Sequence, residues 1–245
     1  MPGQIMVTFD DATEDQFHAM RRMGNVDVPS VVCVPTSLVG SIGFMDWDDL
    51  RILQEEGHAI IGHSASHWWA GIGEEKPIDK HTKNEITRDL LDGQKELNDH
   101  GMDGGCVAIP FGTYNLAGGQ HLQQVGEYFD WVRMTIGAPL SEEHELWSIA
   151  GGKRHFPKNF TGKFIGITCA ADMRYPQGVA EAVRFAADAD ALAVLLFHRV
   201  SEVSGNGQNL TWSRFLDYVN QIDEAIHLNN MEVVLPRDLI GERKT

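Results

Sequence analysis

Apolar runs rich in β-branched residues alternate along the chain with segments in which apolar residues recur at helical spacing. We predict strands at the apolar runs and helices in most of the gaps between them. The predicted strands are 5–9, 30–35, 59–62, 106–110, 131–136, 164–168, 192–197 and 232–235, and the predicted helices are 14–23, 47–56, 83–100, 117–128, 177–188 and 213–229. This alternation is typical of β/α units around a parallel sheet.

The helix predicted at 47–56 illustrates the pattern. Trp47, Leu50 and Leu53 share one face, acidic residues occupy the other, and Gly57 follows as a stop signal. No fixed-period repeat, low-complexity tract or long linker divides the sequence, so we expect a single domain over residues 1–245. The least regular part, 137–163, is expected to be a long excursion between strands.

Composition excludes several classes of partner. The chain has 245 residues, 42% of them hydrophobic, which is enough to bury a large core. Its 35 acidic and 20 basic residues give a net charge of −15, which argues against binding to nucleic acid or to an anionic membrane. No apolar run approaches the roughly 18 residues needed to cross a bilayer, and no leader precedes Thr8. We expect a soluble chain without membrane insertion, and the pattern indicates no oligomeric state.

The cysteines carry no pairing signal. Cys33, Cys106 and Cys169 each lie in an apolar run, far apart and without CxxC spacing. We interpret all three as core residues.

Two adjacent carboxylates, Asp10 and Asp11, directly follow the first apolar run. One interpretation is that Asp11 or Thr13 caps the helix that begins near Glu14. The other is that the turn at the strand end aims both acids at one point, where two ionised carboxylates would require a cation.

A pair of histidines favours the cation. His63 and His67 follow the third apolar run four residues apart, so that a helical turn would let both imidazoles reach one metal ion. The carboxyl ends of parallel strands open onto one face of a barrel, where the acid pair could supply the further ligand. His198 ends another apolar run and is interpreted as a proton-transfer residue at that face, the alternative being a core histidine with a backbone partner.

Taken together, TFDD at 8–11, HSASH at 63–67, IPFG at 109–112 and LLFH at 195–198 resemble the polysaccharide deacetylases of carbohydrate esterase family 4, the NodB-homology fold. The match spans nearly the whole chain in the order typical of that family. The resemblance implies an α/β fold, a distorted (β/α) barrel with about seven parallel strands. It also implies one divalent metal ion, with Zn²⁺ expected and Co²⁺ or Ni²⁺ as alternatives.

The resemblance also implies roles for single residues. Asp10 looks like the catalytic base and His198 like the catalytic acid, while Asp11, His63 and His67 look like the metal ligands. The resemblance extends to three further positions. The backbone amide of Phe111 matches the group that helps to hold the oxyanion. The pair Asp130 and Trp131 is the least close match, to the fourth motif of the family, and the alternative is that this pair only begins a strand.

One departure from the family lies at Ala108, where many members carry an arginine that orients the catalytic base. The segment there is closer to the branch that deacetylates poly-N-acetylglucosamine. Arg133 and Arg199 are candidate replacements for the missing arginine. Trp68 and Trp69 could stack on sugar rings beside the site or could anchor a loop. We interpret the remaining histidines, His58 among them, as surface residues.

The expected function is metal-dependent hydrolysis of N-acetyl groups on an amino-sugar polymer, a reaction at a C–N bond other than a peptide bond. O-acetyl ester hydrolysis on xylan and opening of small cyclic amides are alternatives on the same barrel. A non-catalytic glycan-binding module is a third, against which the presence of both Asp10 and His198 argues. The expected partner is a glycan, which could be extracellular or the target of a virion protein.

Overall fold

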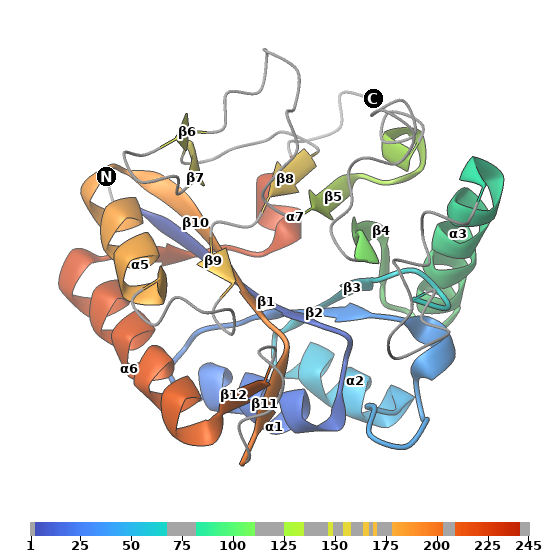
Figure 1. Cartoon of the computed structure of the whole chain (residues 1–245), viewed down its shortest axis with the longest axis horizontal. Coiled ribbons are helices and arrows are strands. Elements are labelled where there is room, and N and C mark those ends of the chain that lie inside the picture. The colour runs from blue at the N-terminus through green and yellow to red at the C-terminus, as the bar shows by residue number, and fades with distance from the viewer. Residues whose placement is uncertain are drawn as a thin grey trace.

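A curled sheet of mostly parallel strands, with helices along its outer side, dominates the structure (Figure 1). The computed structural model describes residues 3–67, 82–110, 125–134, 147–148, 154–157, 164–166, 169–170, 178–202 and 209–240. Within these described residues the sheet has 11 strands, and its central part runs in the order β10-β1-β2-β3-β4-β5-β8 with every neighbouring pair parallel. The predicted α/β barrel-like fold is therefore confirmed, in the form of a curled half-barrel.

The strands of this central part follow the predicted apolar runs. They are β1 (Gln4–Asp10), β2 (Val31–Val34), β3 (Ala59–Gly62), β4 (Asp103–Ala108), β5 (Trp131–Met134), β8 (Phe164–Gly166) and β10 (Ala191–Phe197). β13 (Glu232–Val233) pairs with β1, and β9 (Cys169–Ala170) pairs with β10. Because these strands are parallel, their carboxyl ends share one edge of the sheet.

The sequence pattern missed several short strands. β6 (Trp147–Ser148) and β7 (Arg154–Pro157) lie inside the segment expected to be irregular, and they extend the sheet beyond β10 by antiparallel pairing. β11 (Arg199–Ser201) and β12 (Asn209–Thr211) form a separate pair after β10. Strands this short have too few residues to show a period.

The helices match the prediction wherever both can be compared. They are α1 (Glu14–Gly24), α2 (Trp47–Glu55), α3 (Lys83–Asp99), α5 (Gly178–Asp188), α6 (Trp212–Asn229) and α7 (Pro236–Leu239), with a short 3₁₀ helix η1 (Thr36–Leu38). Most of the helix predicted at 117–128 lies outside the described residues. α7 was not predicted. None of the helices in the described ranges combines the length and apolar character of a membrane span.

The two faces of the sheet carry different cores. On β1, Ile5, Val7 and Phe9 belong to the large outer core, which α1, α2, α5 and α6 cover. Met6 belongs to the inner core of the curled sheet. Since side chains alternate between the faces of a strand, Asp10 is aimed to the inner side with Met6. Polar side chains at the strand ends therefore converge inside the curl.

Strand β4 begins three residues earlier than predicted, at Asp103, because Gly104 and Gly105 belong to it. A Cβ atom on Gly104 would lie 2.4 Å from the Gln94 carbonyl oxygen, and one on Gly105 would lie 2.7 Å from the Arg237 guanidinium. These glycines allow neighbouring elements to approach β4 closely. Apolar periodicity does not detect such contacts, so it could not predict that the strand begins at Asp103.

His58 corrects one expectation of the sequence analysis. It was interpreted as a surface residue, but its side chain is buried and its Nδ1 accepts a hydrogen bond from the Ser30 N–H at 3.0 Å. Buried polar groups need such partners, and this hydrogen bond joins the residue before β3 to the residue before β2.

Candidate active site

The turn after β1 aims two consecutive carboxylates at one region. Asp10 is the last residue of the strand, and the next two residues, Asp11 and Ala12, have left-handed backbone φ angles of 83° and 53°. Such angles are uncommon for residues other than glycine and are held here by neighbouring backbone. The Asp11 N–H donates to the Cys33 carbonyl at 3.1 Å, and the Met45 N–H donates to the Ala12 carbonyl at 2.9 Å. The structure thus brings both acids to the same side of the sheet edge.

His63 and His67 reach this region from the turn after β3. The turn is not helical, because Ser64 and His67 have φ angles of 64° and 56°. Even so, the Nε2 atoms of His63 and His67 lie 3.6 Å and 3.1 Å from Asp11 Oδ1. One ligand atom from each of these three residues lies within 4.8 Å of the others. The expected convergence is present, although the backbone achieves it without the helical turn that the spacing suggested.

The hydrogen bonding of His63 fixes which of its nitrogen atoms faces the carboxylates. Nδ1 lies 2.8 Å from the Ala108 carbonyl oxygen, which can only accept, so Nδ1 carries the proton of a neutral ring. Burial is the main reason that the pKa of His63 is lowered to about 4, so the ring is neutral at neutral pH. Its Nε2 therefore presents a lone pair to Asp11 Oδ1 and to Asp10 Oδ2, the latter 3.7 Å away.

Three acceptors facing one another without a proton between them repel, and a cation removes that repulsion. The donor set of two imidazole nitrogens and one carboxylate oxygen suits Zn²⁺ and neighbouring divalent metals. Two ligands of a tetrahedral Zn²⁺ ion are about 3.3 Å apart, close to both distances found at Asp11 Oδ1. Asp11, His63 and His67 therefore fit a divalent metal ion.

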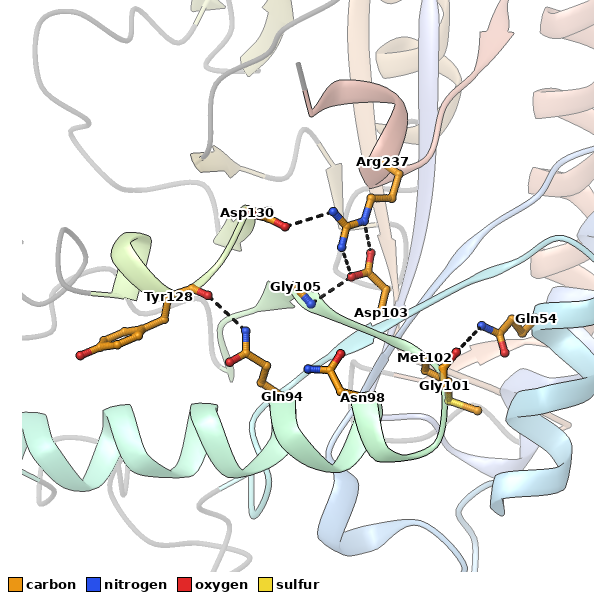
Figure 2. A pocket seen from close by; sticks show the side chains of 10 residues that line it. All are labelled: Gln54, Gln94, Asn98, Gly101, Met102, Asp103, Gly105, Tyr128, Asp130 and Arg237. Atoms are coloured by element: carbon orange, nitrogen blue, oxygen red, sulfur yellow. Dashed lines mark hydrogen bonds and ion pairs between the residues drawn. The ribbon is translucent and has the colours of Figure 1, made fainter. Parts of the chain in front are cut away.

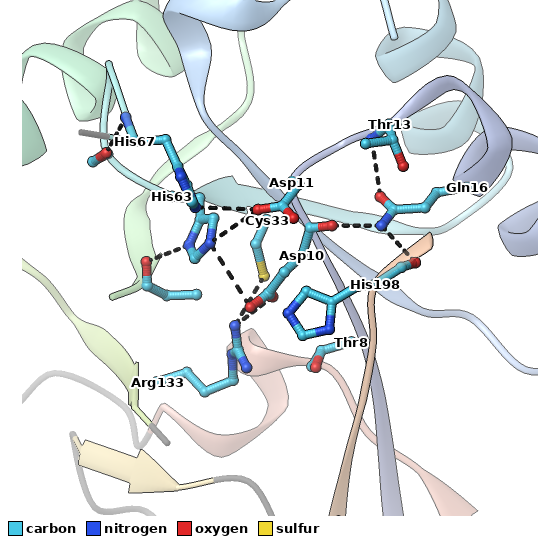
Figure 3. A network of polar contacts seen from close by, with 12 residues as sticks. Thr8, Asp10, Asp11, Thr13, Gln16, Cys33, His63, His67, Arg133 and His198 are labelled. Carbon is cyan, nitrogen blue, oxygen red and sulfur yellow. Dashed lines mark hydrogen bonds and ion pairs between the residues drawn. The ribbon is translucent and has the colours of Figure 1, made fainter. Parts of the chain in front are cut away.

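Asp10 has a different partner. Its Oδ1 forms an ion pair and hydrogen bond with Nη2 of Arg133, and both side chains are buried (Figure 3). Burial by itself raises the pKa of the Asp10 carboxyl, but Arg133, His63 and His198 together lower it by more, so the pKa lies well below its ordinary value. Asp10 is held ionised, with Oδ1 on Arg133 and Oδ2 toward the histidines.

The position of Arg133 explains how the site manages with alanine at 108. Ala108 and Arg133 are direct neighbours in the parallel register of β4 and β5. Side chains at paired positions lie on the same face, so a guanidinium on β5 can reach the region that an arginine at 108 would serve. Of the two candidate replacements, Arg133 makes the contact with Asp10. Arg199 instead lies 3.6 Å from Asp15 and is half exposed.

His198 lies between β10 and β11 and is partly buried. Its imidazole lies beside the Asp10 carboxylate in Figure 3, and its electrostatic interaction contributes to lowering the pKa values of Asp10 and Asp11. Its partial burial places it at the margin of the core, beside the acid pair. The imidazole of His198, which can donate or accept a proton, therefore lies in the same site as Asp10.

The structure does not bring Asp130 to this site. Asp130 lies just before β5, at the opposite edge of the parallel sheet, where Arg237 pairs with it and with Asp103. These residues line a surface hollow of about 630 Å³ (Figure 2). Trp131 is buried in the inner core of the sheet. Phe111, Trp68 and Trp69 lie outside the described residues.

Sequence analysis overlooked two residues that contact the site. Cys33 was expected only to fill the core, but its sulfur lies 3.8 Å from Nη2 of Arg133. Burial raises its pKa well above the ordinary value, so it stays a neutral thiol. Gln16 is buried and hydrogen-bonds the carbonyl groups of Asp10 and His198. A glutamine three residues after Thr13 is the pattern of a capping box. That pattern gives no indication of its hydrogen bonds to the two carbonyl groups.

Comparison with solved structures supports the fold. The family 4 carbohydrate esterase of Streptomyces lividans, solved with acetate, is 11% identical with a TM-score of 0.59, covering 95% of this chain and 92% of its own. The chitin deacetylase of Colletotrichum lindemuthianum is also 11% identical with a TM-score of 0.59, covering 100% and 90%. The Xyl-CE4 domain of a multidomain xylanase from the hindgut metagenome of Trinervitermes trinervoides is 17% identical with a TM-score of 0.54, covering 98% and 91%.

At these sequence identities the similarity to the solved structures shows the fold alone. A search of the curated proteins finds no match to the sequence. A family model supplies the stronger result. The model for polysaccharide deacetylases matches residues 2–128, a span that includes the acid pair, both histidines of the 63–67 turn and Ala108. Since that match extends over more than half of the chain, the protein belongs to the polysaccharide deacetylase family and is a carbohydrate deacetylase.

Proposed function

We propose that the protein removes N-acetyl groups from a polymer of β-linked N-acetylglucosamine, with one divalent metal ion held by Asp11, His63 and His67. The observation that carries the proposal is the unprotonated Nε2 of His63, which faces two carboxylates at 3.6 Å and 3.7 Å. A cation accounts for that arrangement. Zn²⁺ is the metal that the two imidazoles and one carboxylate favour, with Co²⁺ or Ni²⁺ as alternatives.

When bound, the ion would supply Lewis-acid polarisation of the acetyl carbonyl and would acidify the attacking water. Asp10 is the proposed base. Because Arg133 occupies Oδ1, Oδ2 is the oxygen free to take the proton of water as the water oxygen bonds to the acetyl carbon. The Arg133 pair holds the carboxylate in one orientation and keeps it ionised before the reaction.

His198 is the proposed acid. As the C–N bond breaks, its imidazolium gives a proton to the leaving amine nitrogen, and the products are acetate and a free amino sugar. Both proton-transfer groups lie on the same side of the sheet edge as the candidate metal ligands (Figure 3). A proposed base, a proposed acid and a candidate metal site around one position support the proposal, because amide hydrolysis requires this set.

The choice of substrate rests on the family and on the segment after Ala108. The Colletotrichum neighbour is named a chitin deacetylase, whereas the Trinervitermes neighbour is a domain of a xylanase. An N-acetyl substrate is favoured here because the segment 109–115 resembles the poly-N-acetylglucosamine branch. Trp68, Trp69 and the amide of Phe111 are proposed to contact the sugar and the oxyanion.

The test compares acetate release from chito-oligomers and from acetylated xylan, and ring opening of a cyclic imide. Each assay is run with metal-free protein, with added Zn²⁺, Co²⁺ or Ni²⁺, and with chelator. We expect metal-dependent release from chito-oligomers, with chains of several sugars preferred over the monosaccharide because remote contacts can be used in the transition state. Elemental analysis of the wild type and of a His63→Ala/His67→Ala variant locates the metal.

Release from xylan alone would identify an O-acetyl esterase, and turnover of the imide alone would identify a small-amide hydrolase. Full activity in the presence of chelator would contradict the metal site, as would equal metal content in the double variant. No turnover of any substrate would leave glycan binding as the function.

A further inference from the structure

Gln16 occupies an unusual position for a polar side chain. It lies in the first turn of α1 and is fully buried, and each of its hydrogen bonds goes to backbone. Its Nε2 donates to the carbonyl oxygen of Asp10 and, at 2.8 Å, to that of His198, while its Oε1 accepts from the Thr13 N–H at 3.1 Å (Figure 3). One carboxamide therefore connects the ends of two strands.

The two carbonyls belong to the residues proposed as base and acid. A carboxamide nitrogen has two hydrogens, and here one is directed to each carbonyl oxygen. Both oxygens must stay within hydrogen-bonding distance of a single atom, which limits how far the backbone of Asp10 can move relative to that of His198. Pairing of β1 with β10 ends at Phe9 and Phe197, one residue before each of them.

Asp15 adds a second connection from the same turn of α1. Its Oδ2 accepts from the Val200 N–H at 2.6 Å, and its Oδ1 lies 3.6 Å from Nε of Arg199. The consecutive residues 198, 199 and 200 are thus all held by the start of α1. His198 itself belongs to neither β10 nor β11, so these contacts act where strand pairing does not.

We infer that Gln16 is a positioning residue, which sets the separation of Asp10 and His198 through their backbone carbonyls. The inference rests on the proposed function. The simpler explanation is that Gln16 completes a capping box with Thr13. A capping box uses only Oε1, and glutamate serves in it as well as glutamine does. The positioning role uses Nε2, which glutamate lacks.

Gln16→Glu separates the two roles because it keeps the acceptor for Thr13 and removes both donors. We expect kcat on chito-oligomers to fall on the order of 10²-fold, because a displacement of about 1 Å between reacting groups has that effect. KM should stay within about threefold, and metal content should be unchanged. The control is Ala19→Gly, which loosens the same helix without touching either carbonyl. If Gln16→Glu does not fold, Gln16→Met tests the loss of the donors without adding charge.

A second readout does not depend on turnover. In protein carrying ¹³C-labelled histidine, the Cε1–H signal of His198, assigned with His198→Gln, should shift or split in Gln16→Glu, and the signal of His58 should not. If kcat falls no further than in Ala19→Gly and the His198 signal is unchanged, Gln16 only caps the helix and the inference is overturned. If the wild type hydrolyses no acetylated substrate, the proposed function fails, and the His198 signal alone decides whether Gln16 positions it.

Discussion

At the scale of single residues, Asp10 and Asp11 are adjacent in sequence but have different partners. Asp10 binds the guanidinium of Arg133, whereas Asp11 faces the imidazoles of His63 and His67. The left-handed turn after Asp10 gives each carboxylate its own environment. A ligand and a base should therefore fail differently when changed.

The first prediction separates those roles. Asp10→Asn should keep the metal ion and lose activity by about 10²–10⁴-fold, the usual contribution of a general base. Asp11→Asn should lose metal affinity together with activity. Metal titration and acetate release on both variants provide the measurement. Near-normal turnover of Asp10→Asn at saturating metal would show that another group is the base.

The second prediction concerns the buried pair of Asp10 and Arg133. Arg133→Met should lower the free energy of unfolding by about 3–5 kcal/mol, because it leaves a buried carboxylate without a counter-charge. Adding Asp10→Asn should recover most of that loss, since the charge is then gone. Chemical denaturation of the single and double variants measures both values.

The control for that pair is Arg237→Met, at an arginine that pairs with two carboxylates, those of Asp103 and Asp130, but is half exposed. Ion pairs at the surface contribute at most about 1 kcal/mol, so this variant should change stability little. Equal losses at Arg133 and Arg237 would contradict the importance of burial.

At the scale of elements, helix α3 supports the turn that carries the two histidines. The Ala65 N–H donates to the Asp89 carbonyl at 3.0 Å, and the Ser66 N–H donates to the Asp89 carboxylate at 3.1 Å. Gly93 lies on α3 four residues after Asp89 and faces the same backbone turn. A Cβ atom at Gly93 would lie 2.8 Å from the Ser64 carbonyl carbon and 2.9 Å from the Ala65 nitrogen.

The third prediction follows from that contact. Gly93→Ala would gain about 1 kcal/mol in helix propensity in an exposed helix. Here the added methyl group must displace backbone atoms, and overpacking of this kind costs about 1–3 kcal/mol. We expect lower stability and weaker metal binding, measured by denaturation and metal titration. Asp92→Ala, at the exposed neighbouring position, should change neither. A stabilised Gly93→Ala variant with unchanged metal affinity would contradict the prediction, because the turn after β3 would then accommodate the methyl group without disturbing the two histidines.

At the scale of the whole molecule, buried His58 makes the stability of the fold depend on pH. Burial is the main cause that lowers its pKa below 6.5, although the charge of Glu56 opposes the shift. Nδ1 accepts from the Ser30 N–H, which requires that nitrogen to be unprotonated. Below pH 6.5 the unfolded chain therefore binds more protons at this residue than the folded chain does.

The fourth prediction gives the sign of that effect. As the pH falls from about 6.5, His58 should decrease the free energy of unfolding, by at most about 1.4 kcal/mol per pH unit. His58→Asn keeps an acceptor for Ser30 and removes the titration, so its stability should fall less steeply. Denaturation at several pH values compares the slopes, with His18→Asn as the control at an exposed histidine. Equal slopes in wild type and His58→Asn would contradict the prediction.

The order of strands and helices was predictable from the sequence. Runs such as 192–197 alternate with amphipathic segments such as 47–56, and apolar periodicity is a local property. What that pattern could not show were elements set by contacts between distant segments. β6 forms because it pairs with β7, and β7 forms because it pairs with β6 and β10. β4 extends back to Asp103 because glycines let α3 and Arg237 approach it.

The candidate site, like the fold, has features that were predictable from the sequence and features that were not. The sequence alone determined which residue types stand at the strand ends, namely Asp10, Asp11, His63, His67 and His198, because strand ends and motif spacing are local features. Only the tertiary structure decided that Arg133, and not Arg199, binds Asp10, and that Asp130 lies at the opposite edge of the sheet. The register between β4 and β5 and the side of the sheet on which a residue falls decide those contacts, and both depend on how distant strands pair.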